Sequence, residues 1–208
     1  MNRPLHGLYL VTPDWDDTHR LIAVSRQALQ GGARILQYRH KTADARLRRE
    51  QATALQQLCR DYPCLFIIND HVELCAELDA DGIHVGGTDL RVDEVRQRVG
   101  PGKIVGASCY GDLQLARSAQ QHGASYVAFG GFYPSRIKKY PVTTPFDIVT
   151  QAKKEIALPC AVIGGMTVDN SKPLITSGAD MVAAISSVYL ADHPQQAARE
   201  FCQLFGTI

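Results

Sequence analysis

The chain has 208 residues, and 22 Lys and Arg balance 21 Asp and Glu to a formal net charge of +1 with neutral His. That balance argues against a dedicated nucleic-acid-binding protein, an acidic disordered tail and a polybasic membrane anchor. The hydrophobic fraction of 45% is ordinary for a globular protein, and the length suits one domain or two small ones.

Neither a membrane span nor a signal peptide is expected. No stretch reaches the roughly 18 consecutive apolar residues of a span, and the N-terminal apolar run stops at Thr12 and Pro13, before acidic residues. We therefore expect a cytoplasmic protein with no membrane or nucleic-acid partner. The 6 cysteines form no CxxC pair and predict buried free thiols, and the 7 histidines show no zinc-type spacing.

Short apolar runs alternate with longer amphipathic stretches along the chain. The run at 7–12 predicts a strand, and apolar residues at helical spacing predict a helix over 18–30, which Gly31 and Gly32 end. Further strands are predicted at 33–39, 64–69, 82–85, 103–108, 125–130, 159–164 and 180–186, and further helices at 44–60, 71–78, 92–99, 113–122, 144–156, 168–177 and 194–205. Strands that alternate with helices indicate parallel pairing through right-handed crossovers.

Eight strand–helix units predict an α/β fold, a single small (β/α)8 TIM barrel domain over 1–208. The alternative is an open doubly wound sheet, but no GxGxxG follows the first strand. No linker or low-complexity tract marks a second domain. In a barrel, the polar residues at the carboxyl ends of the strands face the ligand, so these ends are the candidate site.

The second strand ends in a polar series with a period of two. Gln37, Arg39 and Lys41 share one face if the strand continues, and an Arg and a Lys at a barrel mouth would bind an anion such as pyrophosphate. The alternative is a solvated basic loop whose cations pair with Asp44 or Glu50.

Acidic residues follow the third and fourth strands. Asn69 and Asp70 end the third strand, and Asp89 lies just beyond the fourth. Carboxylates on adjacent strand ends can hold Mg²⁺, which prefers oxygen ligands. The alternative is that Asp70 and Asp89 cap the helices predicted at 71–78 and 92–99.

The last two strands end in small residues. Gly164 and Gly165 expose backbone amides, and Ser186 and Ser187 precede the final helical segment. The loops after the seventh and eighth barrel strands commonly bind a phosphate, which we expect here. The alternative is a tight glycine turn and a serine cap.

The longest irregular stretch, GGFYPSRIKKYPVTTP, follows the sixth strand at 130–145. Its Gly, Pro and Ser residues together with Lys138 and Lys139 suit a mobile lid that closes over an anion. The alternative is a flexible surface loop.

Taken together, these segments resemble thiamine-phosphate synthases, which are small (β/α)8 barrels. The matching pieces are GLYLVT (7–12), LQYRHK (36–41), IINDHVELCAELDADGIHVGGTDL (67–90), IVGASC (104–109), SYVAFGGFYPSRIKK (125–139), AVIGGM (161–166) and VAAISSV (182–188). The Q-x-R-x-K, I-N-D and A-D-G-x-H-x-G-x-x-D pieces are the specific ones, and the resemblance covers nearly the whole chain.

The resemblance implies a transferase of thiamine biosynthesis that condenses a hydroxymethylpyrimidine pyrophosphate with a thiazole phosphate and releases pyrophosphate, with Mg²⁺ as cofactor. It implies that Gln37, Arg39 and Lys41 hold the pyrimidine substrate, that Asn69, Ser108 and Lys138 contact its pyrophosphate, that Asp70 and Asp89 bind Mg²⁺, and that Ser135, Gly165, Ile185 and Ser186 belong to the substrate site. The implied mechanism is dissociative, with catalysis by Arg39, Lys41, Ser108 and Lys138.

The chain departs from the family pattern at Gly87, Tyr110, Ser135 and Ile137. Ile137 cannot hydrogen-bond a phosphate, whereas Ser135 keeps a hydroxyl. A thiazole tautomerase-like paralogue and a non-catalytic regulatory barrel are the alternatives. The oligomeric state stays open, with a homodimer among the possibilities.

Overall fold

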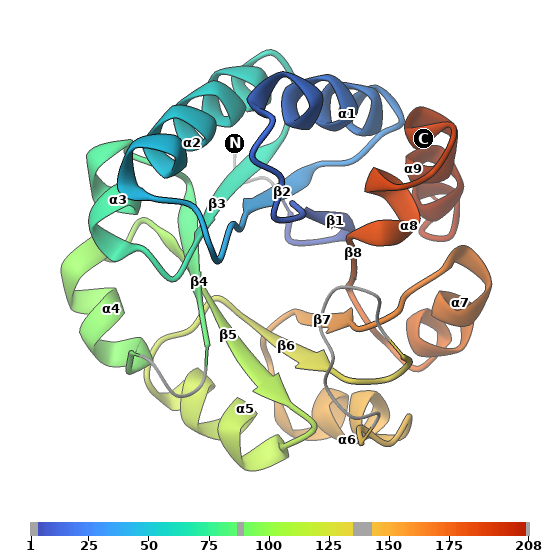
Figure 1. Cartoon of the computed structure of the whole chain (residues 1–208). Helices are drawn as coiled ribbons and strands as arrows, with labels where there is room; N and C mark the ends of the chain where they lie inside the picture. The colour runs from blue at the N-terminus through green and yellow to red at the C-terminus, as the bar shows by residue number, and fades with distance from the viewer. Residues whose placement is uncertain (1–3, 87–89, 135–142, 207–208) are drawn as a thin grey trace.

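The computed structural model describes residues 4–86, 90–134 and 143–206. Within these residues, eight parallel strands close into a barrel in chain order, each strand paired with its neighbours in sequence and β1 paired with β8. The helices form an outer ring around the strands (Figure 1). The predicted (β/α)8 barrel is confirmed, and the open doubly wound sheet is wrong.

The strands are short and almost wholly buried. They are β1 Gly7–Val11, β2 Ile35–Tyr38, β3 Leu65–Asn69, β4 Gly82–Val85, β5 Ile104–Tyr110, β6 Tyr126–Gly130, β7 Cys160–Ile163 and β8 Met181–Ala184. Parallel strands covered on both faces read as continuous apolar runs, which is how the sequence shows them.

The helices agree with the predicted periodicity except after β6 and β8, as described below. They are α1 Thr18–Gln30, α2 Ala45–Arg60, α3 Val72–Glu77, α4 Val92–Val99, α5 Leu113–Gln121, α6 Ile148–Glu155, α7 Val168–Thr176, α8 Ser186–Tyr189 and α9 Pro194–Gln203. Side chains cap several of them: Asp17 accepts from the Arg20 amide at 2.9 Å, and Asp44 accepts from the Leu47 amide at 2.7 Å.

Two apolar cores follow from the alternation of side chains along each strand. The larger one fills the space between the sheet and the helices and includes Leu10, Leu36 and Phe66. The smaller one fills the barrel interior and includes Tyr9, Ile67, Tyr126 and Met181. All six cysteines are free and buried, as predicted: Cys59, Cys64, Cys75, Cys109, Cys160 and Cys202.

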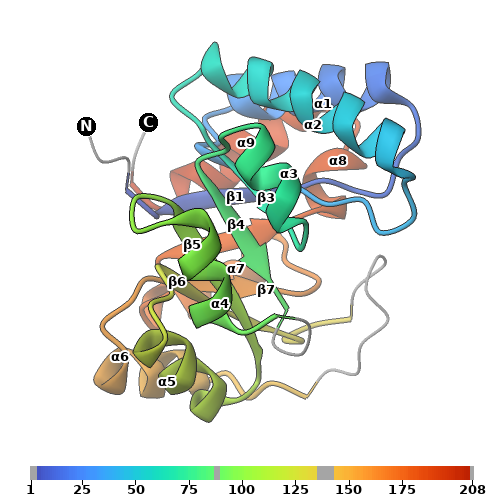
Figure 2. The same ribbon diagram turned by 90° about the vertical axis from the view of Figure 1, so that its left-hand side faces the viewer.

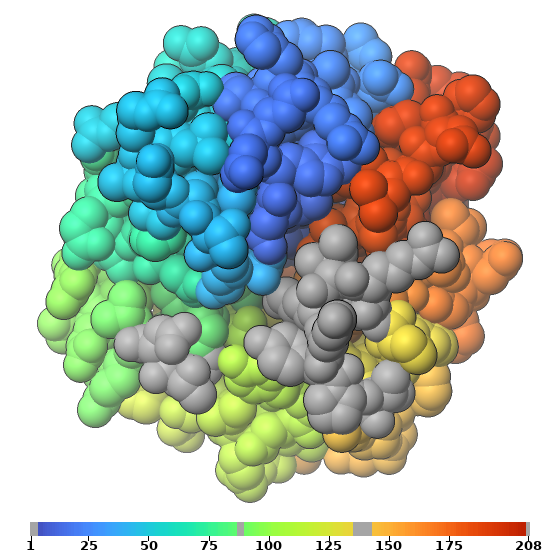
Figure 3. All heavy atoms as spheres, in the orientation of Figure 1, coloured from blue at the N-terminus to red at the C-terminus, as the bar shows by residue number. Residues whose placement is uncertain are grey.

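The ends of the described chain and the carboxyl ends of the strands lie at opposite ends of the barrel. The start of β1 and the end of α9 lie together at one end, where the rings of His6 and Phe205 pack 5.0 Å apart (Figure 2). The carboxyl ends of the strands lie at the opposite end, and the successive parts of the chain follow one another around that rim (Figure 3). No helix within the described residues is long and apolar enough to cross a membrane.

The predicted bounds lie within two residues of those in the structure, except at the start of the helix predicted at 144–156. The helix predicted at 144–156 begins at Ile148, because Pro145 disfavours helical backbone at Thr144, and the Thr144 hydroxyl instead donates to the Gly130 carbonyl. The strand predicted at 180–186 ends at Ala184, and Ser186 begins the short helix α8, which the sequence did not indicate.

Candidate active site

The end of β2 places two cations and an amide at the barrel mouth. Gln37 lies on the interior face, where its Nε2 donates to the Tyr9 hydroxyl at 2.7 Å. The Thr12 hydroxyl bonds both the amide and the carbonyl of Arg39 at 2.8 Å, so the β2 end is tied to the end of β1. Gln37, Arg39 and Lys41 line one cavity, as their two-residue spacing predicted.

Asp14, in the β1–α1 loop, accepts hydrogen bonds from the Arg39 side chain and from the backbone of Lys41. Arg39 Nη1 donates to both Asp14 oxygens, at 3.0 and 3.2 Å, and the Lys41 amide donates to Asp14 Oδ1 at 2.9 Å. The Arg39 side chain is 9% exposed, and its Nε has no hydrogen-bond partner among the described residues. The Arg39 side chain lines this cavity, so a ligand bound there can accept from its guanidinium group.

Asp70 lies next to Lys41. Lys41 Nζ and Asn69 Nδ2 both donate to Asp70 Oδ2, the second at 2.7 Å. Burial by itself would raise the pKa of the Asp70 carboxyl, but the hydrogen bond and charge of Lys41 outweigh it and hold that pKa below its usual value. Asp70 is therefore ionised at neutral pH, and it has a left-handed backbone, with φ of 61°.

A chain of buried polar groups crosses the floor of the mouth. Tyr9 and Tyr126 share a hydrogen bond of 2.6 Å between their hydroxyls, and the Tyr126 hydroxyl lies 2.8 Å from His84 Nδ1. His84 Nε2 lies 2.9 Å from Ser108 Oγ. Burial raises the pKa of both phenols, so each keeps its proton at neutral pH. Gln37 at one end and Ser108 at the other are thus connected by continuous hydrogen bonding.

Two cavities adjoin at this end of the barrel. The polar cavity, of about 170 Å³, is lined by Tyr9, Val11, Gln37, Arg39, Lys41, Asn69, His84, Ser108, Tyr110, Ala128, Ala161, Ile163 and Ala183. The glycine-lined cavity, of about 230 Å³, is lined by Ser108, Tyr110, Ala128, Gly130, Gly131, Tyr133, Thr143, Ile163, Gly164, Gly165, Met166, Ala183, Ile185, Ser186 and Ser187. Several residues, Ser108 and Tyr110 among them, line both cavities. Two small molecules, one in each cavity, would therefore lie in contact with one another.

The glycine-lined cavity depends on a close approach of two loops. A Cβ on Gly165 would lie 2.3 Å from the Pro134 carbonyl oxygen, and one on Gly164 would lie 2.9 Å from the Gly131 nitrogen. Both glycines have positive φ, 114° at Gly164 and 62° at Gly165. Glycine is the residue that meets both demands, because it has no side chain to clash.

The strand β5 has an irregularity that shapes both cavities. Its pairing with β6 shifts register between Ser108 and Tyr110, which puts one extra residue, the buried Cys109, on β5. Tyr110 follows with φ of 50° and is 41% exposed. Ser108 and Tyr110 both line the two cavities.

Three of the alternatives raised from the sequence are wrong. Arg39 and Lys41 pair with Asp14 and Asp70, not with Asp44 or Glu50. Asp70 does not cap α3, whose N-cap is His71 without a side-chain bond. Ser186 is the first residue of α8 and not its cap, a position that Ile185 takes.

Several predicted site residues lie outside the described part of the chain. They are Gly87, Asp89, Ser135, Ile137, Lys138 and Lys139. The described site residues come together at one rim: the polar cavity takes Gln37, Arg39, Lys41, Asn69 and Ser108, and the glycine-lined cavity takes Gly165, Ile185, Ser186 and again Ser108.

Sequence reasoning missed Asp14, Tyr9, Tyr126 and the role of His84. Tyr9 and Tyr126 read as apolar strand residues, although two tyrosines and a histidine inside apolar strands are polar groups that need partners once buried. The need of these buried polar groups for hydrogen-bond partners was the feature of the sequence that could have identified them. Asp14 gave none, because an aspartate in a loop is ordinary.

Comparison with known proteins agrees with this geometry. The family model described as thiamine monophosphate synthase matches residues 8–188. The thiamine-phosphate synthase of Janthinobacterium sp. (strain Marseille) is 65% identical over 205 residues, which is 99% of each chain, and that of Methylobacillus flagellatus is 47% identical over 203 residues, 97% of this chain and 96% of the relative.

Solved structures show the same likeness. The thiamine phosphate pyrophosphorylase from Pyrococcus furiosus superposes with a TM-score of 0.83 and 30% identity, over 96% of this chain and 95% of that one. The KGPDC from Streptococcus mutans, at 18% identity and a TM-score of 0.77, shares the fold alone. The family match, the full-length relatives and the site geometry show that this chain belongs to the thiamine monophosphate synthase family.

Proposed function

We propose that this chain joins a hydroxymethylpyrimidine diphosphate to a thiazole phosphate, giving thiamine phosphate and pyrophosphate. The bond between the pyrimidine methylene carbon and the diphosphate oxygen breaks, and the thiazole nitrogen forms the new bond to that carbon. The observation that carries this proposal is the pair of adjoining cavities, one lined by cations and amides and the other by glycines.

The polar cavity is suited to the diphosphate. When the carbon–oxygen bond breaks, its electron pair leaves with the diphosphate, so negative charge builds on that group. Arg39 and Lys41, which both line this cavity, stabilise this charge. Asn69 and Ser108 line the same cavity and donate hydrogen bonds. The step needs no strong base, because no proton is taken from carbon.

Mg²⁺ is part of the proposal. The donor set fits it in part: Asp70 offers an ionised carboxylate beside the cations, and Asp89, the second proposed ligand, lies outside the described residues. When bound, Mg²⁺ would supply further neutralisation of the diphosphate charge. No group of three or more His, Cys, Asp or Glu within the described residues could hold a metal, so substrate oxygens and water would complete the coordination.

The hydrogen-bonded series from Gln37 to Ser108 orients the side chains at the two ends of the polar cavity. If Gln37 donates to Tyr9, Tyr9 to Tyr126 and Tyr126 to His84 Nδ1, the His84 proton lies on Nε2 and faces Ser108. The Ser108 hydroxyl is then free to donate into the cavity. At the other end the Gln37 carbonyl remains an acceptor for the pyrimidine amino group.

The glycine-lined cavity is suited to the thiazole phosphate. Gly165, Ile185 and Ser186 lie on its wall, and Ile163 and Met166 give it apolar surface for a ring. Ser135 and Lys138 complete the proposed site from the segment outside the described residues, with Lys138 acting on the diphosphate.

The test is turnover by the purified chain. With Mg²⁺ and both substrates, we expect thiamine phosphate and pyrophosphate in equal amounts. Asp70→Ala should lower the rate sharply and weaken its dependence on Mg²⁺, whereas Asp61→Ala, an exposed aspartate at the far end of α2, should not.

Two outcomes would contradict the proposal. Binding of both substrates without release of pyrophosphate would favour a regulatory barrel, and isomerisation of a thiazole carboxylate phosphate would favour the tautomerase. Wild-type rates in Asp70→Ala would refute the metal assignment alone.

The compartment and the assembly belong to the same proposal. Six free, buried thiols are in keeping with a reducing compartment such as the cytoplasm. A homodimer is one of the assemblies open to the chain, and light scattering on the purified protein measures its oligomeric state directly.

A further inference from the structure

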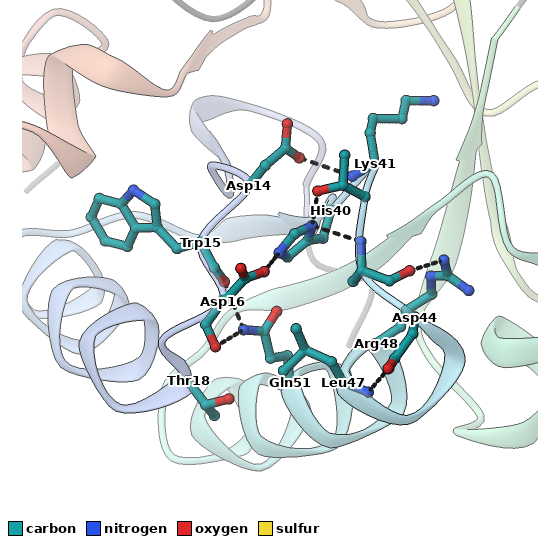
Figure 4. A network of polar contacts seen from close by, with 12 residues as sticks. Asp14, Trp15, Asp16, Thr18, His40, Lys41, Asp44, Leu47, Arg48 and Gln51 are labelled. Carbon is teal, nitrogen blue, oxygen red and sulfur yellow. Dashed lines mark hydrogen bonds and ion pairs between the residues drawn. The ribbon is translucent and has the colours of Figure 1, made fainter.

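His40 lies between the two cations of the polar cavity, yet its side chain faces away from that cavity. Its imidazole has no exposed surface, and it packs beneath the β1–α1 loop (Figure 4). Its Nε2 lies 3.1 Å from Asp16 Oδ1, a carboxylate whose side chain is 85% exposed. The polar cavity does not include His40, so contact with a ligand does not account for this arrangement.

The partners of His40 define its tautomer. The Ala43 amide lies 3.1 Å from Nδ1, and a backbone amide can only donate, so Nδ1 carries the lone pair. The proton therefore lies on Nε2 and is donated to Asp16. The neutral imidazole thus connects its own loop, through Ala43, to the loop that precedes α1.

Other contacts join the same two loops. Asp14 accepts from Arg39 Nη1 and from the Lys41 amide, the residues that precede and follow His40. Gln51 of α2 donates to the Trp15 carbonyl at 2.8 Å, between the two aspartates. Residues 39–43 are therefore bonded to both Asp14 and Asp16 of the β1–α1 loop.

We propose that His40, through its bond to Asp16, is a positioning residue that orients Arg39 and Lys41 for the diphosphate. The inference rests on the proposed function, because it assigns a ligand to those two cations. Arg39 and Lys41 both line the polar cavity, and the backbone that carries them is bonded to the β1–α1 loop through Asp14 and Asp16, so that backbone helps to decide where both charges lie. Donors that are already in place when the ligand arrives lose less free energy on binding it.

A residue that merely stabilises the fold would act differently. Loss of fold lowers the fraction of active enzyme, so it reduces kcat and leaves KM unchanged for both substrates. Loss of positioning at the polar cavity raises KM for the pyrimidine diphosphate and leaves KM for the thiazole phosphate unchanged. The ratio of the two KM values therefore separates the two roles.

The experiment uses Asp16→Ala and Asp16→Asn in the full chain. Asp16 is exposed, so both variants should fold, and the Asn side chain keeps an oxygen that accepts from His40. We expect Asp16→Ala to raise KM for the pyrimidine diphosphate by about three- to tenfold, the effect of one hydrogen bond. Asp16→Asn should stay within about twofold of wild type, and Asp61→Ala is the matched control.

His40→Asn tests the other side of the same bond. The Asn oxygen takes the place of Nδ1 and still accepts from Ala43, but nothing reaches Asp16. We expect it to match Asp16→Ala, and the double variant to be no worse than either single one, because both changes remove one interaction.

Binding of inorganic pyrophosphate with Mg²⁺, measured by calorimetry, provides a readout independent of turnover. Its affinity should fall in Asp16→Ala by the same factor as KM rises. Unchanged affinity in an active enzyme, equal changes in both KM values, or additive effects in the double variant would overturn the role of His40. A wild-type chain that makes no thiamine phosphate but binds pyrophosphate in an Asp16-dependent way would overturn the proposed function and leave the positioning role standing.

Discussion

The two halves of the barrel mouth are built in different ways. After β2 and β3, the surface of the mouth is formed by long side chains, and carboxylates pair with Arg39 and Lys41 there. The half after β7 and β8 uses backbone, with Gly164 and Gly165 close against the loop after β6. The first half is defined by charge and the second by the absence of a Cβ.

This difference decides what each half tolerates. A side-chain site loses function when a charge is removed or displaced, although the backbone stays where it was. A backbone site loses function when any side chain is added, whatever its charge. The two halves meet at Ser108 and Tyr110, which line both cavities, so a change there should affect both substrates.

The largest effect is expected from Arg39→Ala. Removal of a charged donor that faces the leaving group should lower kcat/KM for the pyrimidine diphosphate by about 10²- to 10³-fold. Arg39→Lys should recover little of it, because the single ammonium of a lysine does not reproduce the planar, multi-donor guanidinium that pairs with Asp14 and lines the cavity.

Steady-state kinetics with each substrate varied in turn measures this effect. Arg26→Ala, an exposed arginine on the outer face of α1, is the matched control. A loss confined to the thiazole phosphate would mean that the charged half has been assigned to the wrong substrate.

Gly165→Ala should produce the next largest effect, on the other substrate. The added Cβ meets the Pro134 carbonyl oxygen, and the left-handed backbone costs a non-glycine residue about 1–2 kcal/mol. We expect KM for the thiazole phosphate to rise roughly tenfold or more, since 1.4 kcal/mol corresponds to a factor of ten.

Gly102→Ala is the control for Gly165→Ala, because a Cβ there meets no atom within 4 Å. Thermal unfolding should show Gly165→Ala to be folded at the assay temperature. Equal changes in KM for both substrates would argue that the two cavities act as one.

The sequence predicts the fold well because period-two and period-3.6 apolar patterns report local structure directly. It also places Gln37, Arg39 and Lys41 on one face, since spacing along a strand determines which side a residue takes. The convergence of residues from different strands follows from the barrel itself, whose strand ends share one rim.

The partners of these residues could not be predicted. That Asp14 and not Glu50 pairs with Arg39 depends on the path of the β1–α1 loop, which carries no periodic signal. The helix α8 has four residues, too few to show a period. The Tyr9–Tyr126 bond joins residues 117 positions apart, and local patterns contain no information about such pairs.

The smallest effect is expected from Tyr126→Phe, where the two halves are connected. The ring stays and keeps its packing against His84, at a centroid distance of 5.6 Å, but the hydroxyl that joins Tyr9 to His84 is lost. One net hydrogen bond corresponds to about 0.5–1.5 kcal/mol, so kcat/KM should fall about two- to tenfold.

The comparison of the two substrates makes this variant informative. Without the Tyr126 hydroxyl, His84 Nδ1 loses the bond that favours the tautomer with the proton on Nε2. The donation from Nε2 to Ser108, and that of Ser108 into the cavity, should therefore weaken. Because Ser108 lines both cavities, both substrates should be affected in parallel, unlike in Arg39→Ala or Gly165→Ala. Tyr62→Phe, in the turn after α2, removes a hydroxyl from a residue that lines neither cavity, and it should leave both KM values unchanged. If Tyr126→Phe instead altered the pyrimidine diphosphate alone, the polar chain would serve Gln37 and not Ser108, and the connection between the two halves would lie elsewhere.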